Sequence, residues 1–307
     1  MFSFAKGAAL AALMGAGLDA GSLQEALAAR MAGFPGTVSL YAKNLDSGAS
    51  IGIHESDRVR TASTIKLPTL VALFDAVARG AAKWNEPLTV TAAEKVTGSG
   101  IIGSEISDGV QLPLRDVANL MIVLSDNTAT NMIIERIGAD TVNAYLDKIG
   151  IHTTRLMRKV RGDGGQLNAA EGWSAAGKLP ENQKYGLGVS TPRDMAAILE
   201  RLENGELVSP EVCRDILAIL KRNQDNTGIR RGLGDLPIAN KSGALDALRS
   251  DVGIVYSKAG RIAMAITVDG IPQPDWGPDN PGSILISDLA KLLVEGLAPA
   301  QAVPAVK

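Results

Sequence analysis

The sequence has few of the residues from which metal and redox sites are built: among 307 residues there are one cysteine, Cys213, and two histidines, His54 and His152. A single cysteine cannot form an internal disulfide, and the segment around it, PEVCRDILAIL, has the pattern of a buried helix, so redox chemistry is not expected. A zinc site with three protein ligands would need both histidines and the cysteine at one point, which disfavours a metal-dependent hydrolase. We therefore expect neither a metal nor another cofactor.

The chain also lacks an excess of charge of one sign. It has 31 lysines and arginines against 33 aspartates and glutamates, for a net charge of -2. Without a basic surplus, binding to nucleic acid is not expected. The hydrophobic share of 46% and the charged share of 21% are typical of a soluble globular protein, and the length allows about two domains or one large one. The expected partner is a small molecule, and the chain is expected to act as a monomer.

Long hydrophobic runs are absent as well. The first twenty residues, MFSFAKGAALAALMGAGLDA, hold one lysine followed by an apolar run from Gly7 to Leu18, which is too short to span a bilayer but long enough for a secretory signal. We therefore expect residues 1–20 to be a signal peptide and the protein to be periplasmic or secreted. The run has no clean A-x-A cleavage site, so a loose N-terminal helix on a cytoplasmic protein stays open. No later segment reaches membrane-spanning length.

The hydrophobic pattern changes twice along the chain. In residues 36–55, GTVSLYAKNLDSGASIGIHE, apolar and polar residues alternate on both sides of a turn-forming DSG, which predicts an antiparallel hairpin after a short helix at 23–32. Between about residues 66 and 220 the apolar residues recur at helical spacing. The strand pattern returns near Pro237 in three short segments, and a helix closes the domain at about 283–295.

This order predicts an α+β fold. Five short antiparallel strands bury a face better as one sheet than as two separate ribbons, so the two ends of the chain are expected to share a five-stranded sheet flanked by helices. The helical stretch is then an inserted all-helical lobe. We expect one domain over 21–297, divided into an α/β lobe (21–65 and 222–297) and a helical lobe (66–221), with a C-terminal tail at 298–307.

The segment TASTIKLPTL, residues 61–70, places Ser63 three residues before Lys66 where the first helical pattern begins. At this spacing the two side chains lie on one face, so an uncharged lysine amine could act as the base that a serine nucleophile needs. Burial and a nearby cation would both lower the lysine pKa. The alternative is a serine that caps the helix beside a solvated lysine, and the motif alone does not decide between them.

A second polar segment, LSDNTATN at 124–131, separates two helical patterns. Its serine, aspartate and asparagine are all good N-caps, so it is expected at least to start the next helix. In the functional interpretation Ser125 relays a proton to a leaving amine and Asn127 holds a substrate amide.

A third segment, NKSGA at 240–244, ends a strand pattern. It is either a strand that runs into a glycine turn with an exposed lysine, or part of the same site. In the second interpretation Lys241 supplies the required second cation and Ser242 donates to a substrate carboxylate. Gly243 then lets the substrate backbone approach closely.

Together the three motifs, S-x-x-K, S-D-N and K-S-G in that order, resemble those of class A β-lactamases and penicillin-binding proteins. The likeness to class A runs from about residue 22 to 295 and extends beyond the motifs, to GSGII at 98–102, the helical segments at 112–138 and 190–199, and NKSGALDALRSDVGIVYS at 240–257.

The resemblance implies the β-lactamase/transpeptidase-like fold and an acyl-serine mechanism. By this likeness Ser63 attacks the carbonyl of a lactam or an acyl-D-Ala group, and the backbone N–H groups of Ser63 and Ala244 hold the oxyanion. Lys66 and Ser125 transfer the protons, and the lysine and serine of K-S-G bind the substrate carboxylate.

One family feature is missing. Class A enzymes carry a glutamate three residues before a Leu-Asn pair, and this glutamate activates the water that releases the acyl group. Here the pair is Leu167-Asn168, and counting back gives Gly164. Counting forward from the family-like RLMR at 155–158 gives Val160 instead. Neither position holds a carboxylate, so we expect a remodelled loop.

The candidates for the release step are therefore Asp163, Glu171 and Glu181, together with Asn168. Each acidic side chain is equally well interpreted as a solvated loop charge. The leading hypothesis is hydrolysis of β-lactam amides through an acyl-enzyme on Ser63. The alternatives are a D-Ala-D-Ala peptidase, an esterase or a penicillin-binding relative that releases its acyl group slowly, and a binding protein that forms no adduct at all.

Overall fold

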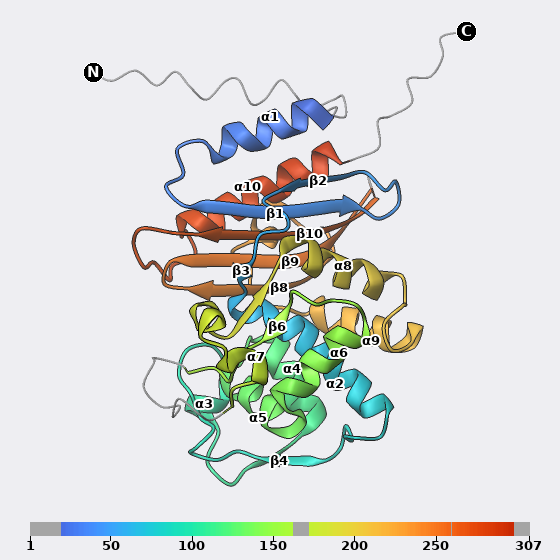
Figure 1. Ribbon diagram of the computed structural model, residues 1–307, viewed down its shortest axis with the longest axis vertical. Helices are drawn as coiled ribbons and strands as arrows, with labels where there is room; N and C mark the ends of the chain where they lie inside the picture. Colours follow the sequence, from blue (N-terminus) through green and yellow to red (C-terminus); the bar gives the residue numbers. More distant parts are fainter. Residues whose placement is uncertain (1–19, 162–171, 259, 298–307) are drawn as a thin grey trace.

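In the computed structural model, the described part of the chain comprises residues 20–161, 172–258 and 260–297, and it is built around one five-stranded antiparallel sheet. The strand order is β2-β1-β10-β9-β8, so the N-terminal hairpin pairs with the last strand (Figure 1). These strands are β1 (Thr37–Asn44), β2 (Ser50–Ile53), β8 (Ile238–Leu245), β9 (Leu248–Ser257) and β10 (Gly260–Asp269). The five-stranded antiparallel sheet that the sequence predicts is confirmed.

Helices cover both faces of this sheet. On one face α1 (Ala20–Met31) and α10 (Pro281–Gly296) bury the outward-facing half of the strand residues, among them Leu40 and Ile266. The other half, among them Val252 and Ala265, belongs to a second core shared with the helical lobe. The alternation of side chains along a strand thus divides one sheet between two cores.

The helical lobe surrounds α2, the most buried helix of the group. Its helices are α2 (Lys66–Ala78), α3 (Ile102–Glu105), α4 (Leu114–Val123), α5 (Asn127–Ile137), α6 (Ala139–Lys148), α7 (Ala175–Lys178), α8 (Pro192–Glu203) and α9 (Pro210–Leu220). The described residues also form three short 3-10 helices: η1 (Ala62–Ile65), η2 (Pro180–Tyr185) and η3 (Ile229–Gly232). Of these helices, α8 packs on α9 and also lies against β1 and β10 of the main sheet (Figure 1).

Three helices begin with the same pair of residues, a capping side chain followed by proline. Thr191, Ser209 and Asn280 each accept a hydrogen bond from a backbone N–H of the first turn, and each is followed by proline. The side chain satisfies a backbone donor that would otherwise have no partner, and proline has no N–H to satisfy at that position. The starts of α8, α9 and α10 are therefore fixed locally.

The expectation of an all-helical lobe is wrong in detail. Two small sheets lie within residues 59–190: β3 (Val59–Arg60), β7 (Gly188–Ser190) and β6 (Arg155–Leu156) form one, and β4 (Pro87–Thr89) and β5 (Gln111–Pro113) form the other. Strands of two or three residues are too short to show an alternating pattern, so the sequence gives no sign of them.

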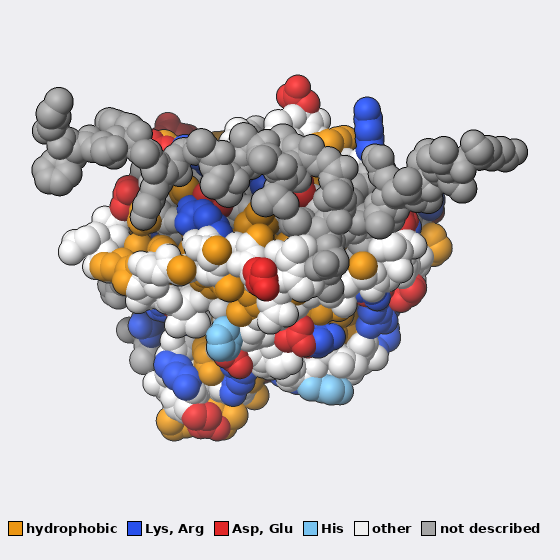
Figure 2. All heavy atoms as spheres, turned by 90° about the horizontal axis from the view of Figure 1, so that it is seen from above, with side chains coloured by type: hydrophobic (Ala, Val, Ile, Leu, Met, Phe, Trp, Pro, Cys, Tyr) orange, Lys and Arg blue, Asp and Glu red, His pale blue; other side chains and the backbone are white. Residues whose placement is uncertain are grey.

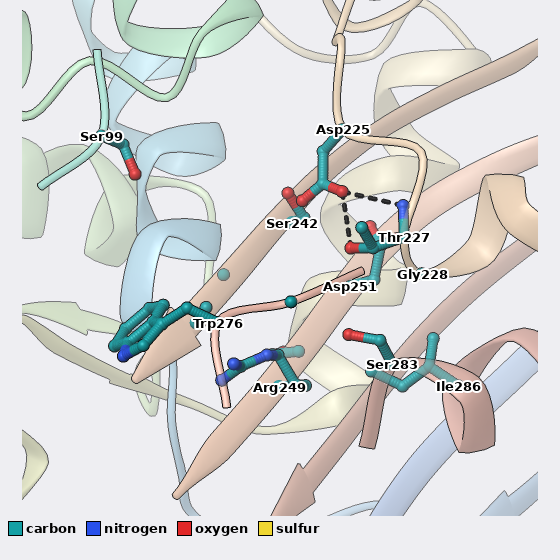
Figure 3. Close-up of a pocket in the computed structure, with 14 residues that line it drawn as sticks. Ser99, Asp225, Thr227, Gly228, Ser242, Arg249, Asp251, Trp276, Ser283 and Ile286 are labelled. Carbon is teal, nitrogen blue, oxygen red and sulfur yellow. Dashed lines mark hydrogen bonds between the residues drawn. The ribbon is translucent and has the colours of Figure 1, made fainter. Parts of the chain in front are cut away.

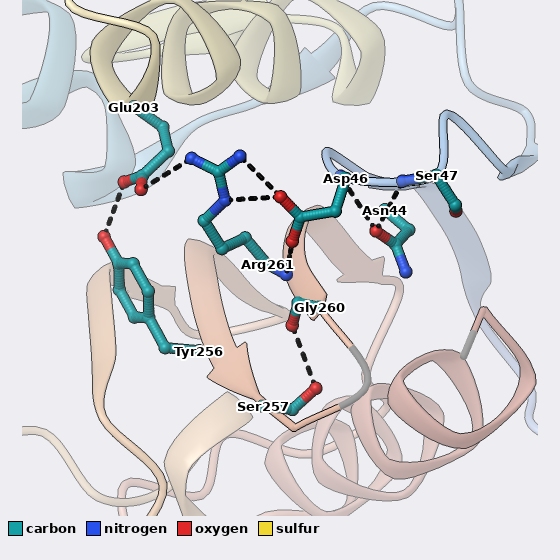
Figure 4. A network of polar contacts seen from close by, with 8 residues as sticks. All are labelled: Asn44, Asp46, Ser47, Glu203, Tyr256, Ser257, Gly260 and Arg261. Atoms are coloured by element: carbon teal, nitrogen blue, oxygen red, sulfur yellow. Dashed lines mark hydrogen bonds and ion pairs between the residues drawn. The ribbon is translucent and has the colours of Figure 1, made fainter. Parts of the chain in front are cut away.

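Polar contacts connect α8 to the edge of the main sheet (Figure 4). Arg261 of β10 pairs with Asp46 and with Glu203, and Tyr256 of β9 donates to the same glutamate at 2.7 Å. This network fixes α8 on β9 and β10, and the opposite end of β9 lines the cavity described below.

Charges of both signs are interspersed on the face of the molecule seen in Figure 2, in keeping with the near-zero net charge. Within the described ranges, none of the helices has the length and apolar character needed to cross a bilayer.

Candidate active site

Ser63 and Lys66 lie where the chain enters the helical core, as the sequence indicates. Ser63 is in η1, and Lys66 is the first residue of α2. In a 3-10 turn the side chains at i and i+3 lie one above the other, so the two residues face the same side. Ala62, just before the serine, has a positive φ of 46°, which is uncommon for a residue with a Cβ and is a form of backbone strain that clusters at active sites.

The side chain of Lys66 is completely buried. Its Nζ lies 2.7 Å from the backbone oxygen of Ser125, 3.1 Å from the hydroxyl of Ser125 and 2.9 Å from Oδ1 of Asn127. The interpretation of Lys66 as a solvated lysine is therefore wrong, and two of the three motifs meet at its amine.

An ammonium could donate to all three oxygens, and an uncharged amine can also make all three contacts. A carbonyl oxygen and an amide oxygen can only accept, so the amine donates its two hydrogens to Ser125 O and Asn127 Oδ1. A hydroxyl can also donate, so Ser125 can give its hydrogen to the lone pair of the amine. Burial lowers the pKa of Lys66 well below its usual value, and the charge of Lys241 lowers it further.

The direct contact expected between Lys66 and Ser63 is not formed. Across the described residues, no hydrogen bond involves the Ser63 hydroxyl, and the Lys66 amine is instead bonded to three oxygens of the S-D-N segment. The serine is thus next to the amine in the helix but not bonded to it in this structure.

The S-D-N segment is both a helix start and a wall of the site. Asp126 caps α5, with Oδ1 accepting from the N–H of Ala129 at 2.8 Å. Its Oδ2 accepts from the backbone N–H groups of Ile101 and Ile102 at 2.7 and 2.9 Å, which fixes the GSGII loop. The capping role that the sequence indicates is confirmed for Asp126, and the positive φ of 55° at Ser125 marks a second strained backbone.

Both polar atoms of the Asn127 side chain are hydrogen-bonded within the protein, and each keeps capacity for a second bond. Its Oδ1 accepts from Lys66, and its Nδ2 donates to the backbone oxygen of Thr97 at 3.1 Å. The amide contact proposed for Asn127 from the sequence can use the second hydrogen of Nδ2 while both of these bonds stay in place.

The K-S-G segment is the end of β8 and completes the site. Lys241 is fully buried and donates to the backbone oxygen of Ser242 at 2.8 Å, so the interpretation as an exposed lysine is wrong. Burial lowers the pKa of Lys241 to about 8, against the opposing charges of Asp225 and Asp251. A Cβ on Gly243 would lie 2.8 Å from the backbone nitrogen of Ser63, so this glycine lets β8 approach the nucleophile segment.

A cavity of about 210 Å³ opens beside these residues (Figure 3). Its lining includes Ser242, Gly243 and Ala244 of β8, with Ser99 of the GSGII loop on the other side. The close-up shows three further side chains that the sequence analysis missed: Asp225, Arg249 and Trp276.

Asp225 belongs to the loop before β8. Burial raises the pKa of its carboxyl, but hydrogen bonds from Ser242 and Thr227 and the charge of Lys241 outweigh burial and hold the pKa below its usual value. In the sequence, only the turn-forming segment DNTG at 225–228 marks this aspartate. In the structure Thr227 donates to Oδ1 of Asp225 from both its backbone N–H and its hydroxyl.

Asp251 lies fully buried beneath the cavity. It accepts from Nδ2 of Asn240 at 2.9 Å and from the N–H of Ile229 at 2.9 Å, which ties β8 to η3. Burial raises its pKa to about 6. Its place is structural, since it supports the strand that carries Lys241.

Three of the candidates for the release step, Asp163, Asn168 and Glu171, lie outside the described residues. The fourth, Glu181 in η2, is exposed to solvent.

Val160, one of the two positions where counting places the missing glutamate, is held firmly. Its N–H donates to Oδ1 of Asn131 at 2.7 Å, and its oxygen accepts from Nδ2 of the same side chain at 3.0 Å. Asn131 is on α5, the helix that begins at Asn127. Val160, which has no titratable group, is thus anchored to α5, the helix that forms a wall of the site.

The chain is similar to known β-lactamases over most of its length. A model of the β-lactamase enzyme family matches residues 22–297. The β-lactamase AST-1 of Nocardia asteroides is 26% identical over 266 residues, which cover 85% of this chain and 79% of that protein. The crystal structure of a β-lactamase from Sphaerobacter thermophilus matches with a TM-score of 0.77 and 29% identity, over 92% of this chain and 100% of that one.

The structure of PBP-A is also similar, with a TM-score of 0.73 and 31% identity over 91% of this chain and 96% of that one. A leucine-to-glutamate mutant of PBP-A is known as an acyl-enzyme complex with penicillin G. The fold and the site thus define a hydrolase of the group that includes β-lactamases and penicillin-binding proteins. The chain belongs to the β-lactamase enzyme family.

Proposed function

We propose that the protein is a serine hydrolase that forms an acyl-enzyme on Ser63 and acts on β-lactam amides. The observation that carries the proposal is the environment of Lys66. Its amine is fully buried and contacts the hydroxyl of Ser125. Burial and the charge of Lys241 hold its pKa well below the usual value. A buried lysine without a carboxylate partner is costly to a protein, and a role as a base accounts for that cost.

In the proposed reaction the Oγ of Ser63 bonds to the lactam carbonyl carbon and its proton passes to the neutral amine of Lys66. The oxyanion that develops is held by the backbone N–H groups of Ser63 and Ala244. The carbon–nitrogen bond then breaks, and the nitrogen takes the proton of Ser125. Lys66 returns its extra proton to Ser125 across their 3.1 Å contact, so the amine ends neutral again.

The substrate carboxylate is proposed to bind at Lys241 and Ser242. Lys241 keeps most of its charge at neutral pH, since its pKa is about 8, and it directly precedes Ser242 on β8. The anionic Asp225 already faces this pair, so a bound carboxylate has to share the lysine and the hydroxyl with it.

Release of the acyl group is the step on which the alternatives differ. Hydrolysis needs a base to take a proton from water, and such a base is typically worth about a hundredfold to ten-thousandfold in rate. Val160, anchored by Asn131, offers none. This observation, with the similarity to PBP-A, favours slow release as the second candidate function: a protein that binds β-lactams covalently and turns them over poorly.

A burst experiment with a chromogenic cephalosporin separates the two. We expect a burst equal to the protein concentration, followed by a steady rate, and a mass increase on the peptide that contains Ser63. A fast steady rate supports the lactamase, whereas a stable adduct supports the slow-release relative. Absence of both burst and adduct with the intact protein, at rates equal to those of Ser63→Ala, would refute the acyl-enzyme proposal.

We also propose that the protein acts outside the cytoplasm, since residues 1–20 have the pattern of a secretory signal. Cell fractionation with N-terminal sequencing of the product tests this, and an uncleaved protein found only in the cytoplasm would contradict it.

A further inference from the structure

Trp276 is the most exposed large apolar side chain in the described ranges, with 66% of its surface accessible. It lines the cavity that also contains Ser242, Gly243 and Ala244 (Figure 3). No step of the proposed reaction uses it. Exposure of a large indole ring in the cavity that reaches Ser242 is a feature that a binding role would explain.

The guanidinium group of Arg249 lies against one face of the indole ring of Trp276. The guanidinium carbon of Arg249 lies 5.0 Å from the centre of the indole ring. Arg249 is itself fixed, because its Nη1 donates to the backbone oxygens of Leu245 and Leu248 at 2.6 and 2.7 Å, and its Nη2 donates to the oxygen of Asp275. One face of the indole therefore rests on a buried, immobile cation.

The loop that carries Trp276 is tied down as well. Asn280, the N-cap of α10, donates from Nδ2 to the oxygen of Asp275 at 2.8 Å, and the N–H of Gly277 donates to Oδ1 of Asp275 at 2.8 Å. A tryptophan fixed before the ligand arrives loses little side-chain entropy on binding. The second face of the ring is thus preorganised to receive a planar group.

The position of the ring indicates which part of a substrate it meets. In the proposed reaction the substrate carboxylate lies at Lys241 and Ser242, and Ser242 lines the same cavity as Trp276. In penicillins, cephalosporins and acyl-D-Ala peptides this carboxylate belongs to the part that contains the leaving nitrogen, not to the acyl group. Trp276 therefore lies on the leaving-group side.

The positive charge of Arg249 behind the indole ring determines which kind of substrate group can stack on Trp276. A cation on one face draws the electron density of the ring toward itself, which leaves the opposite face a poorer partner for a second cation. A planar neutral group stacks without this penalty.

We propose that Trp276 is a specificity-determining residue that stacks a planar, uncharged aromatic group carried next to the carboxylate on the leaving-group side of the substrate. This inference deepens the proposed function and rests on it.

The test uses three cephalosporins with one acylamino side chain and a different group on the carbon beside the carboxylate: methyl, neutral aryl, or a cationic pyridinium ring of the same size. The second-order rate of Ser63 labelling is measured by intact mass for the wild type, Trp276→Ala, Trp276→Phe and, as a control, Val110→Ala, which removes another exposed apolar side chain in the β4–β5 region.

We expect Trp276→Ala to slow labelling by the aryl compound about threefold to tenfold, the range expected for one lost aromatic contact, and to change the methyl compound less than about twofold. Trp276→Phe should keep most of the aryl preference, the pyridinium compound should gain less from Trp276 than the aryl compound, and Val110→Ala should resemble the wild type. Equal losses with all three compounds would mean that Trp276 only covers Arg249, and would overturn the proposal, as would unchanged rates.

If no compound labels Ser63, the proposed function fails and the stacking is decided separately. Calorimetry of the three compounds with Ser63→Ala, and with the same variant carrying Trp276→Ala, then measures binding without reaction. A threefold to tenfold preference for aryl over methyl that disappears with the indole supports the stacking site, and no preference refutes it.

Discussion

Lys66 and Ser125 form the central pair of the site: the Nζ of the lysine lies 2.7 Å from the backbone oxygen and 3.1 Å from the hydroxyl of the serine. Because the first atom only accepts and the second can donate, the pair is fully hydrogen-bonded when the amine is neutral. The same arrangement provides a path for a proton from the amine to the hydroxyl. Activation of the nucleophile and protonation of the leaving group thus depend on one contact.

Replacement of Lys66 by Met tests the role of the amine. We expect labelling of Ser63 to slow about a hundredfold to ten-thousandfold, the range for loss of a positioned base. Stability should change little, because methionine removes the cost of burying the amine but also removes its three hydrogen bonds to Ser125 and Asn127. Thermal unfolding and labelling are measured side by side, with the exposed Lys258→Met as control. Labelling at the wild-type rate would contradict the assignment.

Replacement of Val160 by Glu tests the release step. The Asn131 side chain holds the backbone of residue 160 through two hydrogen bonds, and these do not depend on the side chain at 160. A carboxylate introduced there should shorten the lifetime of the acyl adduct, by about tenfold or more if it reaches the water as a base. Adduct decay is followed by intact mass. Val160→Gln, which has the same shape but cannot take up a proton, should leave the lifetime unchanged, and equal effects of the two variants would argue against a base at this position.

Replacement of Gly243 by Ala tests the close approach of β8 to the nucleophile. The new Cβ would lie 2.8 Å from the nitrogen of Ser63 and 2.8 Å from the oxygen of Thr61, both backbone atoms that cannot turn aside. We expect a loss of stability of about 1–3 kcal/mol, as for overpacking of a core, and a larger loss of labelling because Ser63 has to shift. Chemical denaturation measures the free energy of unfolding, and intact mass measures the rate of Ser63 labelling. A variant with normal stability and normal labelling would show that the approach is less tight than described.

Much of this site is visible in the sequence because its motifs are local. The spacing of Ser63 and Lys66, the capping residues at 125–127 and the strand that ends in K-S-G each lie within one short segment. The main strands were predictable for the same reason, since alternation in β1 and nearly continuous apolar runs in β9 and β10 extend over eight to ten residues.

What the sequence does not show depends on contacts between distant segments. Asp225 and Trp276 line one cavity only because β8 and the loop before α10 meet there. The burial of Lys241 likewise follows from the pairing of β8 with β9 and its contact with η1, which no local pattern reveals. The hydroxyl of Ser63 lacks its expected bond to Lys66, and the amine is instead bonded to Asn127 and Ser125, sixty residues away.

The pH dependence of Ser63 labelling by a penicillin is the measurement that tests the central claim most directly. The reaction needs a neutral Lys66, whose pKa is held well below its usual value by burial and by Lys241. It also needs a charged Lys241, whose pKa burial lowers to about 8. We therefore predict a rate that reaches its full value well below the ordinary lysine pKa of about 10.4, and that falls above about pH 8 as Lys241 loses its proton. Lys241→Arg should move that fall to higher pH. A rate that instead climbs steadily to about pH 10.4, the ordinary lysine value, would show that Lys66 is charged at neutral pH and would contradict the account.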